Sequence, residues 1–244
     1  MFKFFRRIRF DLMEKNKTRK YLKYAIGEIF LVVIGILIAL SINNWNENRK
    51  LNKEELNLLS DIKANLISSL DTFKNDSLLN QRDILRYEKI EYYLEKDLKY
   101  NVELDSAFGV LTFWSTPYIT SSAYKTLQTK GLDLIKNEQL RQEIVRVYEV
   151  ELKSLVEDYD KSEWSINEIV NDFFSKHIRR LHKTSLVLAR PNNFEALKRN
   201  EEFDNLLSMI IRQRKRGQEF FGDVMFEMRN LIEDIETELR SREK

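Results

Sequence analysis

Hydrophobic and polar positions follow a helical period along most of this chain. Beyond the first fifty residues, large apolar side chains recur every three or four positions, the spacing of one face of an α-helix. Such stretches cover residues 51–98, 137–181 and 200–235. The period weakens around residues 77–81 and again between Arg214 and Gly217, where we expect a break or a bend. Long amphipathic helices bury their apolar faces against each other, so the pattern predicts an all-α fold, an elongated antiparallel helical bundle.

A run of a different kind precedes the bundle. Residues 25–42 are apolar on all sides and contain one charged residue, Glu28. As a helix the run is about 27 Å long at 1.5 Å per residue, close to the roughly 30 Å hydrocarbon core of a bilayer. Aromatic residues of the kind found at membrane interfaces flank it: Tyr21, Tyr24 and Trp45. The run predicts one transmembrane helix over residues 24–45.

The same run has two other interpretations. A core helix of a soluble domain is also apolar, but it seldom lacks a polar side. A cleavable signal peptide is the stronger alternative, because Ala39-Leu40-Ser41 fits a small-x-small cleavage pattern behind a positive region. That positive region is over 20 residues long and the apolar run exceeds a usual signal sequence, which favours an uncleaved anchor.

Charge is unevenly distributed and predicts an orientation. Residues 1–23 contain nine Lys or Arg and two acidic residues, whereas the rest of the chain is mildly acidic. The positive-inside rule places residues 1–23 in the cytoplasm and residues 46–244 outside it, as one helical domain. A nucleic-acid binder would carry its basic surface on the folded domain, so we expect no nucleic-acid partner.

The basic segment also carries an apolar stripe at helical spacing. Its members are Phe2, Phe5, Ile8 and Leu12. Either this segment is an interfacial helix lying on anionic lipid, or its charges serve only as the topogenic signal. Both interpretations make the lipid bilayer a partner of the chain.

Small residues within the apolar run suggest contact with a second helix. Gly27, Gly35 and Ala39 share one helix face, and Gly35-x-x-x-Ala39 is a small-xxx-small pair that permits close helix approach. This face predicts a homodimer through the transmembrane helix. Glu28 is either a functional intramembrane acid or a side chain that reaches the nearby interface.

Composition restricts the chemistry. The 244 residues include no cysteine, which excludes disulfides, thiolate metal sites and a cysteine nucleophile, while six Gly and two Pro argue against a many-turned β fold. His177 and His182 are five positions apart on an expected helix, whereas a metal pair needs three or four. The chain lacks the nucleotide-binding, nucleophile-elbow and zinc motifs. We expect no catalytic residues, no cofactor and no metal.

Residues 106–124 carry no charge, although 33% of the whole chain is charged. Five aromatic residues lie in this segment: Phe108, Phe113, Trp114, Tyr118 and Tyr124. Its Ser, Thr and Pro content argues against a second membrane span. The segment is either a connector folded into the bundle core, with Pro117 turning the chain, or an aromatic, hydroxyl-lined pocket or partner-docking loop.

Several motifs resemble the opening of a family of uncharacterised bacterial membrane proteins, a domain of unknown function. They are Tyr24–Ile29, Leu31–Leu40 and Asn43–Glu47, with a further match across residues 123–141. Ser41 and Lys130 depart from the family pattern. The resemblance implies a single-span anchor in the inner membrane of a Gram-negative envelope, with a helical periplasmic domain, and implies no chemistry.

These observations lead to a functional expectation. We expect a non-enzymatic, single-pass membrane protein whose periplasmic helical domain is a scaffold or interaction module for an unknown membrane or periplasmic protein. The alternative is an extracytoplasmic ligand-binding or sensing module that signals through a membrane partner, because 23 cytoplasmic residues are too few for an output domain. An enzyme with an unrecognised site is the third possibility.

Overall fold

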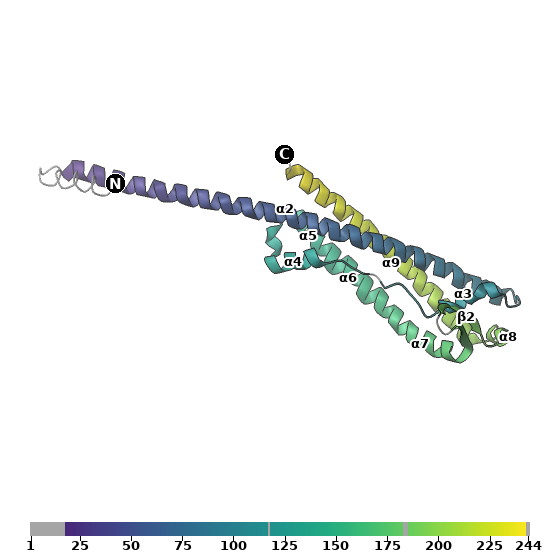
Figure 1. Cartoon of the computed structure of the whole chain (residues 1–244). Coiled ribbons are helices and arrows are strands. Elements are labelled where there is room, and N and C mark those ends of the chain that lie inside the picture. Colours follow the sequence, from purple (N-terminus) through teal and green to yellow (C-terminus); the bar gives the residue numbers. More distant parts are fainter. Residues whose placement is uncertain (1–17, 117, 183–184, 243–244) are drawn as a thin grey trace. The chain divides into compact units, whose positions relative to one another are not determined.

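The computed structural model describes residues 18–116, 118–182 and 185–242, and the stripe at residues 2–12 and Pro117 lie outside these ranges. The described chain is predominantly helical, so the all-α prediction is confirmed (Figure 1). It divides into two compact units, the first ending at Glu55 and the second beginning at Leu56. Helix α2 (Thr18–Glu95) contains the apolar run and also the first bundle helix. The break expected near residues 77–81 is wrong, because α2 is continuous there.

The second long helix of the bundle is assembled from consecutive segments, two of them π-helical. They are α5 (Glu138–Arg146), the π-helical η3 (Val147–Glu151), α6 (Leu152–Ser154), the π-helical η4 (Leu155–Asp160) and α7 (Lys161–His177). Asn137 caps its start, because the Asn137 Oδ1 atom accepts a hydrogen bond of 3.2 Å from the Leu140 N–H. The third long helix is α9 (Glu201–Arg242), which continues through Arg214 and Gly217.

Shorter elements connect these helices. Between α2 and α5 lie η1 (Val102–Leu104), α3 (Asp105–Gly109), α4 (Ser122–Lys130) and η2 (Leu132–Leu134), and α8 (Phe194–Leu197) precedes α9. Helix α9 runs antiparallel to α2, since Phe73 packs on Phe221 while Asn80 bonds to Arg214. It also runs antiparallel to the second long helix, since Arg146 pairs with Glu227 while Glu163 pairs with Arg214.

A two-stranded antiparallel hairpin interrupts the expected helical pattern. Strand β1 (Ile178–His182) pairs with β2 (Ser185–Pro191), with Arg180 opposite Ala189. The helix predicted to reach residue 181 therefore ends at His177, and the two histidines lie on different elements. Contacts of the Arg180 side chain, one of them with a residue far away in the sequence, explain the difference. The Arg180 guanidinium donates to the Gly109 carbonyl at 2.6 Å and lies over the Phe174 ring at 4.5 Å.

The bundle core consists of two hydrophobic clusters, one after the other along the helices. The first includes Leu59–Phe73 of α2 and Phe221–Ile235 of α9, and the second includes Tyr87, Ile90 and Phe203–Ile211. Buried polar side chains lie between the two clusters on all three long helices. They are Ser77, Asn80, Asp160, Glu163, Gln213 and Arg214, which we call the polar layer.

Between α3 and α4, the described residues of the uncharged segment return the chain along α2 in an extended form. The Tyr87 hydroxyl donates to the Val110 carbonyl at 2.8 Å, whereas the Thr120 N–H donates to Ser69 Oγ at 2.9 Å. Residue numbers increase along the segment while those of the α2 residues that it contacts decrease, so the two run antiparallel. Where this connector contacts the helices, at Val110 and Thr120, charged residues would be unfavourable in it.

Candidate functional site

Helix α2 holds the one stretch, among the described residues, that is long and apolar enough to cross a membrane. Its mean hydropathy over 18 residues is 2.7, and none of this window is buried within the chain. Trp45 follows the stretch with an exposed side chain, and the Arg49 guanidinium lies 5.9 Å from its ring centroid. Tyr21 and Tyr24 belong to the same helix, but their side chains fall outside the described part.

The small residues of this stretch lie on an open surface of the chain. A Cβ atom added at Gly27 or Gly35 would meet no heavy atom within 4 Å, and Ala39 is exposed. Close approach of another helix to this face is therefore sterically possible. Self-association through Gly27, Gly35 and Ala39 stays a prediction.

The five aromatic residues of the uncharged segment occupy different environments. Phe108 is fully buried in the second core cluster, and Tyr124 is buried in the first. Trp114 is half-buried and donates from Nε1 to a carboxylate of the polar layer at 2.9 Å. Phe113 is 37% exposed, and Tyr118 is 75% exposed. They do not gather into one pocket, and most of the segment behaves as the connector that the sequence also allowed.

The polar layer centres on an ion pair between Glu163 of α7 and Arg214 of α9. The Arg214 side chain is 5% exposed and the Glu163 side chain is 1% exposed. Arg214 Nη2 donates to the Phe113 carbonyl at 2.9 Å, and Asn80 Nδ2 donates to the Arg214 carbonyl at 2.8 Å. The pair therefore joins three helices and the extended connector. Burial raises the pKa of the adjacent Tyr159 hydroxyl, and the Glu163 carboxylate raises this pKa further.

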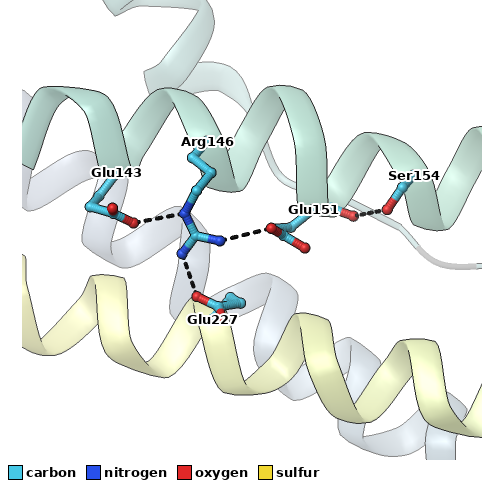
Figure 2. Close-up of polar contacts among 5 residues, drawn as sticks. All are labelled: Glu143, Arg146, Glu151, Ser154 and Glu227. Carbon is cyan, nitrogen blue, oxygen red and sulfur yellow. Dashed lines mark hydrogen bonds and ion pairs between the residues drawn. The ribbon is translucent and has the colours of Figure 1, made fainter.

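We call η3, α6 and η4 together the π-helical segment. A second polar network connects this segment to α9 (Figure 2). Arg146 donates from Nε to Glu143 at 2.9 Å and from Nη1 to Glu151 at 2.7 Å, and its Nη2 pairs with Glu227 of α9. Hydrogen bonds to Glu227 and Glu143 raise the pKa of Arg146, so the guanidinium stays charged. The Ser154 hydroxyl donates to the Glu151 carbonyl at 2.9 Å. These bonds hold the wide turns of η3 in place.

A shallow groove of about 220 Å³ lies between α4 and this π-helical segment. The rings of Tyr124 and Tyr148 stack at its base, with centroids 4.4 Å apart and planes 3° from parallel. Apolar and basic side chains complete the groove. They include Ile119, Leu152 and Val156, with Lys125 and Lys153 exposed at the edge. Tyr124 is the one residue of the predicted aromatic set that lines this groove.

The two stacked tyrosines differ in hydrogen bonding. The Tyr124 hydroxyl bonds to Glu149, and burial raises the pKa of Tyr124 to about 12, with a further contribution from Glu149. The Tyr148 hydroxyl is buried and has no hydrogen-bond partner within the described ranges. Sequence reasoning missed Tyr148 because it matches the apolar period of its helix.

Residues 28–188 match DUF6090, a family of unknown function. The chain belongs to this family. The DUF6090 match begins at Glu28 in the apolar stretch and ends within β2, so it includes the connector, the π-helical segment and both walls of the groove, while α9 lies beyond it. No curated protein and no solved structure matches the chain. The predicted resemblance to an uncharacterised family is confirmed, and the family supplies no chemistry.

The part of this DUF6090 protein that the structure describes contains no cluster of side chains that could hold a metal ion. No group of three or more His, Asp or Glu side chains is placed to hold an ion within those residues. His177 instead stacks on the Phe173 ring, with centroids 4.4 Å apart. The described polar groups mainly connect elements of the fold to one another.

Replacing Tyr148 by phenylalanine is expected to leave the free energy of unfolding unchanged or to raise it slightly. The substitution removes a buried hydroxyl that has no partner among the described residues, and such a group costs about 1–3 kcal/mol. The matched control is Tyr87→Phe, which removes the bond to the Val110 carbonyl and should lower stability by about 1–2 kcal/mol. Urea unfolding of the full-length protein followed by circular dichroism measures both. Equal losses in the two variants would contradict the expectation.

Proposed function

We propose that this DUF6090 protein is a non-enzymatic, single-pass membrane protein whose residues 46–244 form a periplasmic scaffold or interaction domain. The observation that supports this best is a contrast within α2. Apolar side chains between Ala25 and Ile42 are exposed, whereas those from Leu58 to Ile90 that face the bundle are buried in its core. One helix thus combines a stretch without internal packing and a stretch that organises a folded domain.

A bilayer accounts for the exposed stretch. Residues Ile29–Leu40 include ten large aliphatic or Phe side chains, which together contribute roughly −3 to −6 kcal/mol to membrane insertion. In water, a contiguous apolar surface of this kind promotes aggregation. The basic residues of segment 1–23 favour a cytoplasmic N-terminus in the inner membrane, which puts the bundle in the periplasm.

Exposed apolar side chains on the bundle support an interaction role. Leu78, Leu85 and Tyr92 follow one another at intervals of seven residues on α2, and their exposures are 64%, 63% and 52%. Residues at this spacing share a helix face. Such a face is typical of a surface that contacts another protein, and we propose a membrane or periplasmic protein as the partner.

A cysteine-labelling experiment tests the anchor and its orientation. The chain has no cysteine, so Lys17→Cys and Lys161→Cys each introduce a single reporter. In intact cells with a permeabilised outer membrane, a membrane-impermeant maleimide should label the Lys161→Cys variant and not the Lys17→Cys variant. Lysis should make both accessible, which is the control for reactivity.

Membranes from the same cells are then washed with alkaline carbonate. The protein should remain in the membrane pellet. Release into the supernatant, cleavage after Ser41, or labelling of the Lys17→Cys variant in intact cells would each contradict the proposed topology.

A further inference from the structure

We infer that the groove above Tyr124 and Tyr148 binds a partner protein through one large apolar side chain that is flanked by carboxylates. This inference rests on the proposed interaction role and names a contact surface for it. The groove is formed within the second compact unit by α4 on one side and by η3, α6 and η4 on the other.

The size of the groove decides what kind of occupant it takes. Pockets for small molecules usually enclose roughly 300–1,000 Å³. A groove of about 220 Å³ is smaller and fits one or two side chains. Its apolar lining of Ile119, Leu152 and Val156 surrounds the stacked tyrosine rings. Protein interfaces concentrate their binding energy where an apolar or aromatic anchor fills such a pocket.

The charges at the edge of the groove indicate which charges the partner should carry beside its apolar side chain. Lys125 and Lys153 are exposed, and neither forms an ion pair with another described residue. The acidic member of the lining, Glu149, already accepts hydrogen bonds from Gln128 at 2.9 Å and from Tyr124. The edge therefore offers two available ammonium groups and a carboxylate that is already hydrogen-bonded. Carboxylates on either side of a partner's apolar side chain complement this arrangement.

The wall of the groove combines an uncommon helical geometry with a buried hydroxyl that has no partner among the described residues. Among the residues that the structure describes, π-helical turns occur in η3 and η4, and both contribute to this wall through Tyr148 and Val156. Such turns are rare and are frequently found at functional sites. The Tyr148 hydroxyl is also buried without a hydrogen-bond partner in the described part of the chain. The wide π-helical turns of this wall point to binding rather than to packing alone, and Tyr148 contributes its ring, because its hydroxyl is buried.

The full-length protein in lipid nanodiscs provides the test. The probe is the peptide acetyl-Asp-(4-fluorophenylalanine)-Asp-amide, observed by fluorine NMR during titration with protein. We expect binding that is at least tenfold tighter than that of the matched peptide in which Lys replaces both Asp residues. An unlabelled acetyl-Asp-Leu-Asp-amide should displace the probe, whereas acetyl-Asp-Ala-Asp-amide should displace it at least tenfold less well.

Charge reversal locates the contact. The double variant Lys125→Glu/Lys153→Glu should lose binding of the acidic probe at least tenfold and should prefer the basic peptide. The matched control is Lys99→Glu/Lys161→Glu, which makes the same charge change at exposed positions outside the groove and should leave both affinities unchanged. Circular dichroism checks that both variants remain folded.

Four results would overturn the inference. They are no binding of the acidic probe, equal losses in both double variants, equal competition by the alanine peptide, and displacement by sodium oleate but not by the leucine peptide. The last result would assign the groove to an acyl chain instead of a protein. None of these results bears on membrane anchoring, which the cysteine-labelling experiment tests separately.

Discussion

Replacing Glu163 by glutamine should lower the free energy of unfolding by about 3–5 kcal/mol. The substitution preserves the shape of the side chain and removes its charge. Arg214 would then be buried at 5% exposure without a counter-ion, which is among the most destabilising situations in a protein interior. For a domain of this size, the thermal midpoint should fall by roughly 6–20 °C, at about 2–4 °C per kcal/mol.

The contacts around Arg214 oppose a movement of its guanidinium into solvent. Arg214 Nη2 is bonded to the Phe113 carbonyl, and the Arg214 backbone carbonyl accepts from Asn80. Moving the guanidinium into solvent would break its bond to the extended connector, and the Asn80 bond holds the Arg214 backbone in place on the α2 side. Thermal unfolding of the full-length protein in detergent, followed by circular dichroism, measures the loss.

Two controls separate this effect from the loss of any carboxylate. Asp172→Asn on the same helix breaks an ion pair with Lys176 that is well exposed, and should change stability by less than about 0.5 kcal/mol. The double variant Glu163→Leu/Arg214→Met removes both charges and should recover most of the loss, because Arg214 Nε has no hydrogen-bond partner among the described residues. A loss below about 1 kcal/mol for Glu163→Gln would show that the pair is not buried as a charged pair.

The polar layer also explains where the sequence pattern misled. The apolar stripes of the first and third long helices weaken at Ser77–Gln81 and at Arg214–Gly217, and both interruptions suggested a break or bend. In the structure these two positions face one another, because Gln218 donates to Ser77 at 2.7 Å and Asn80 donates to Arg214. A polar residue at a buried position and a helix break give the same pattern in one helix. Only the pairing of two such positions distinguishes them.

Most of the architecture was accessible because it depends on local periodicity. The three long helices, the Asn137 cap and the apolar stretch are each specified by residues close together in the sequence. The hairpin could not be predicted from the sequence, because it depends on contacts between distant residues. Its strands are stabilised by Arg180 contacting Gly109 and by Arg190 forming paired hydrogen bonds with Asp105, more than 70 residues away.

The candidate groove shows the same limit at the level of a site. Tyr124 drew notice because it belongs to an uncharged aromatic segment, whereas Tyr148 has the ordinary spacing of a core residue. Periodicity predicts that Tyr148 is buried and gives no information about the partner of its hydroxyl. The π-helical turns that bring it beside Tyr124 depend on the Arg146 network, which includes a residue of α9.

Gly109→Ala should have the second large effect, lowering stability by about 3 kcal/mol. An added Cβ atom would lie 2.1 Å from the Val187 carbonyl oxygen and 2.7 Å from the Leu188 backbone nitrogen. These atoms belong to the backbone of β2, so no side-chain rotation relieves the overlap. The strand must move away from α3, and this movement strains the bond between Arg180 and the Gly109 carbonyl.

Gly222→Ala is the matched control, because it makes the same chemical change where space is available. An added Cβ atom at Gly222 meets no heavy atom within 4 Å, and alanine is favoured over glycine in a helix by roughly 0.5–1 kcal/mol. Urea unfolding of the full-length variants should therefore show opposite signs, a loss for Gly109→Ala and a small gain for Gly222→Ala. If Gly109→Ala were as stable as the wild-type chain, the hairpin would not pack against α3 through this glycine. The extended connector, which begins directly after α3, would then require a different anchor at that end.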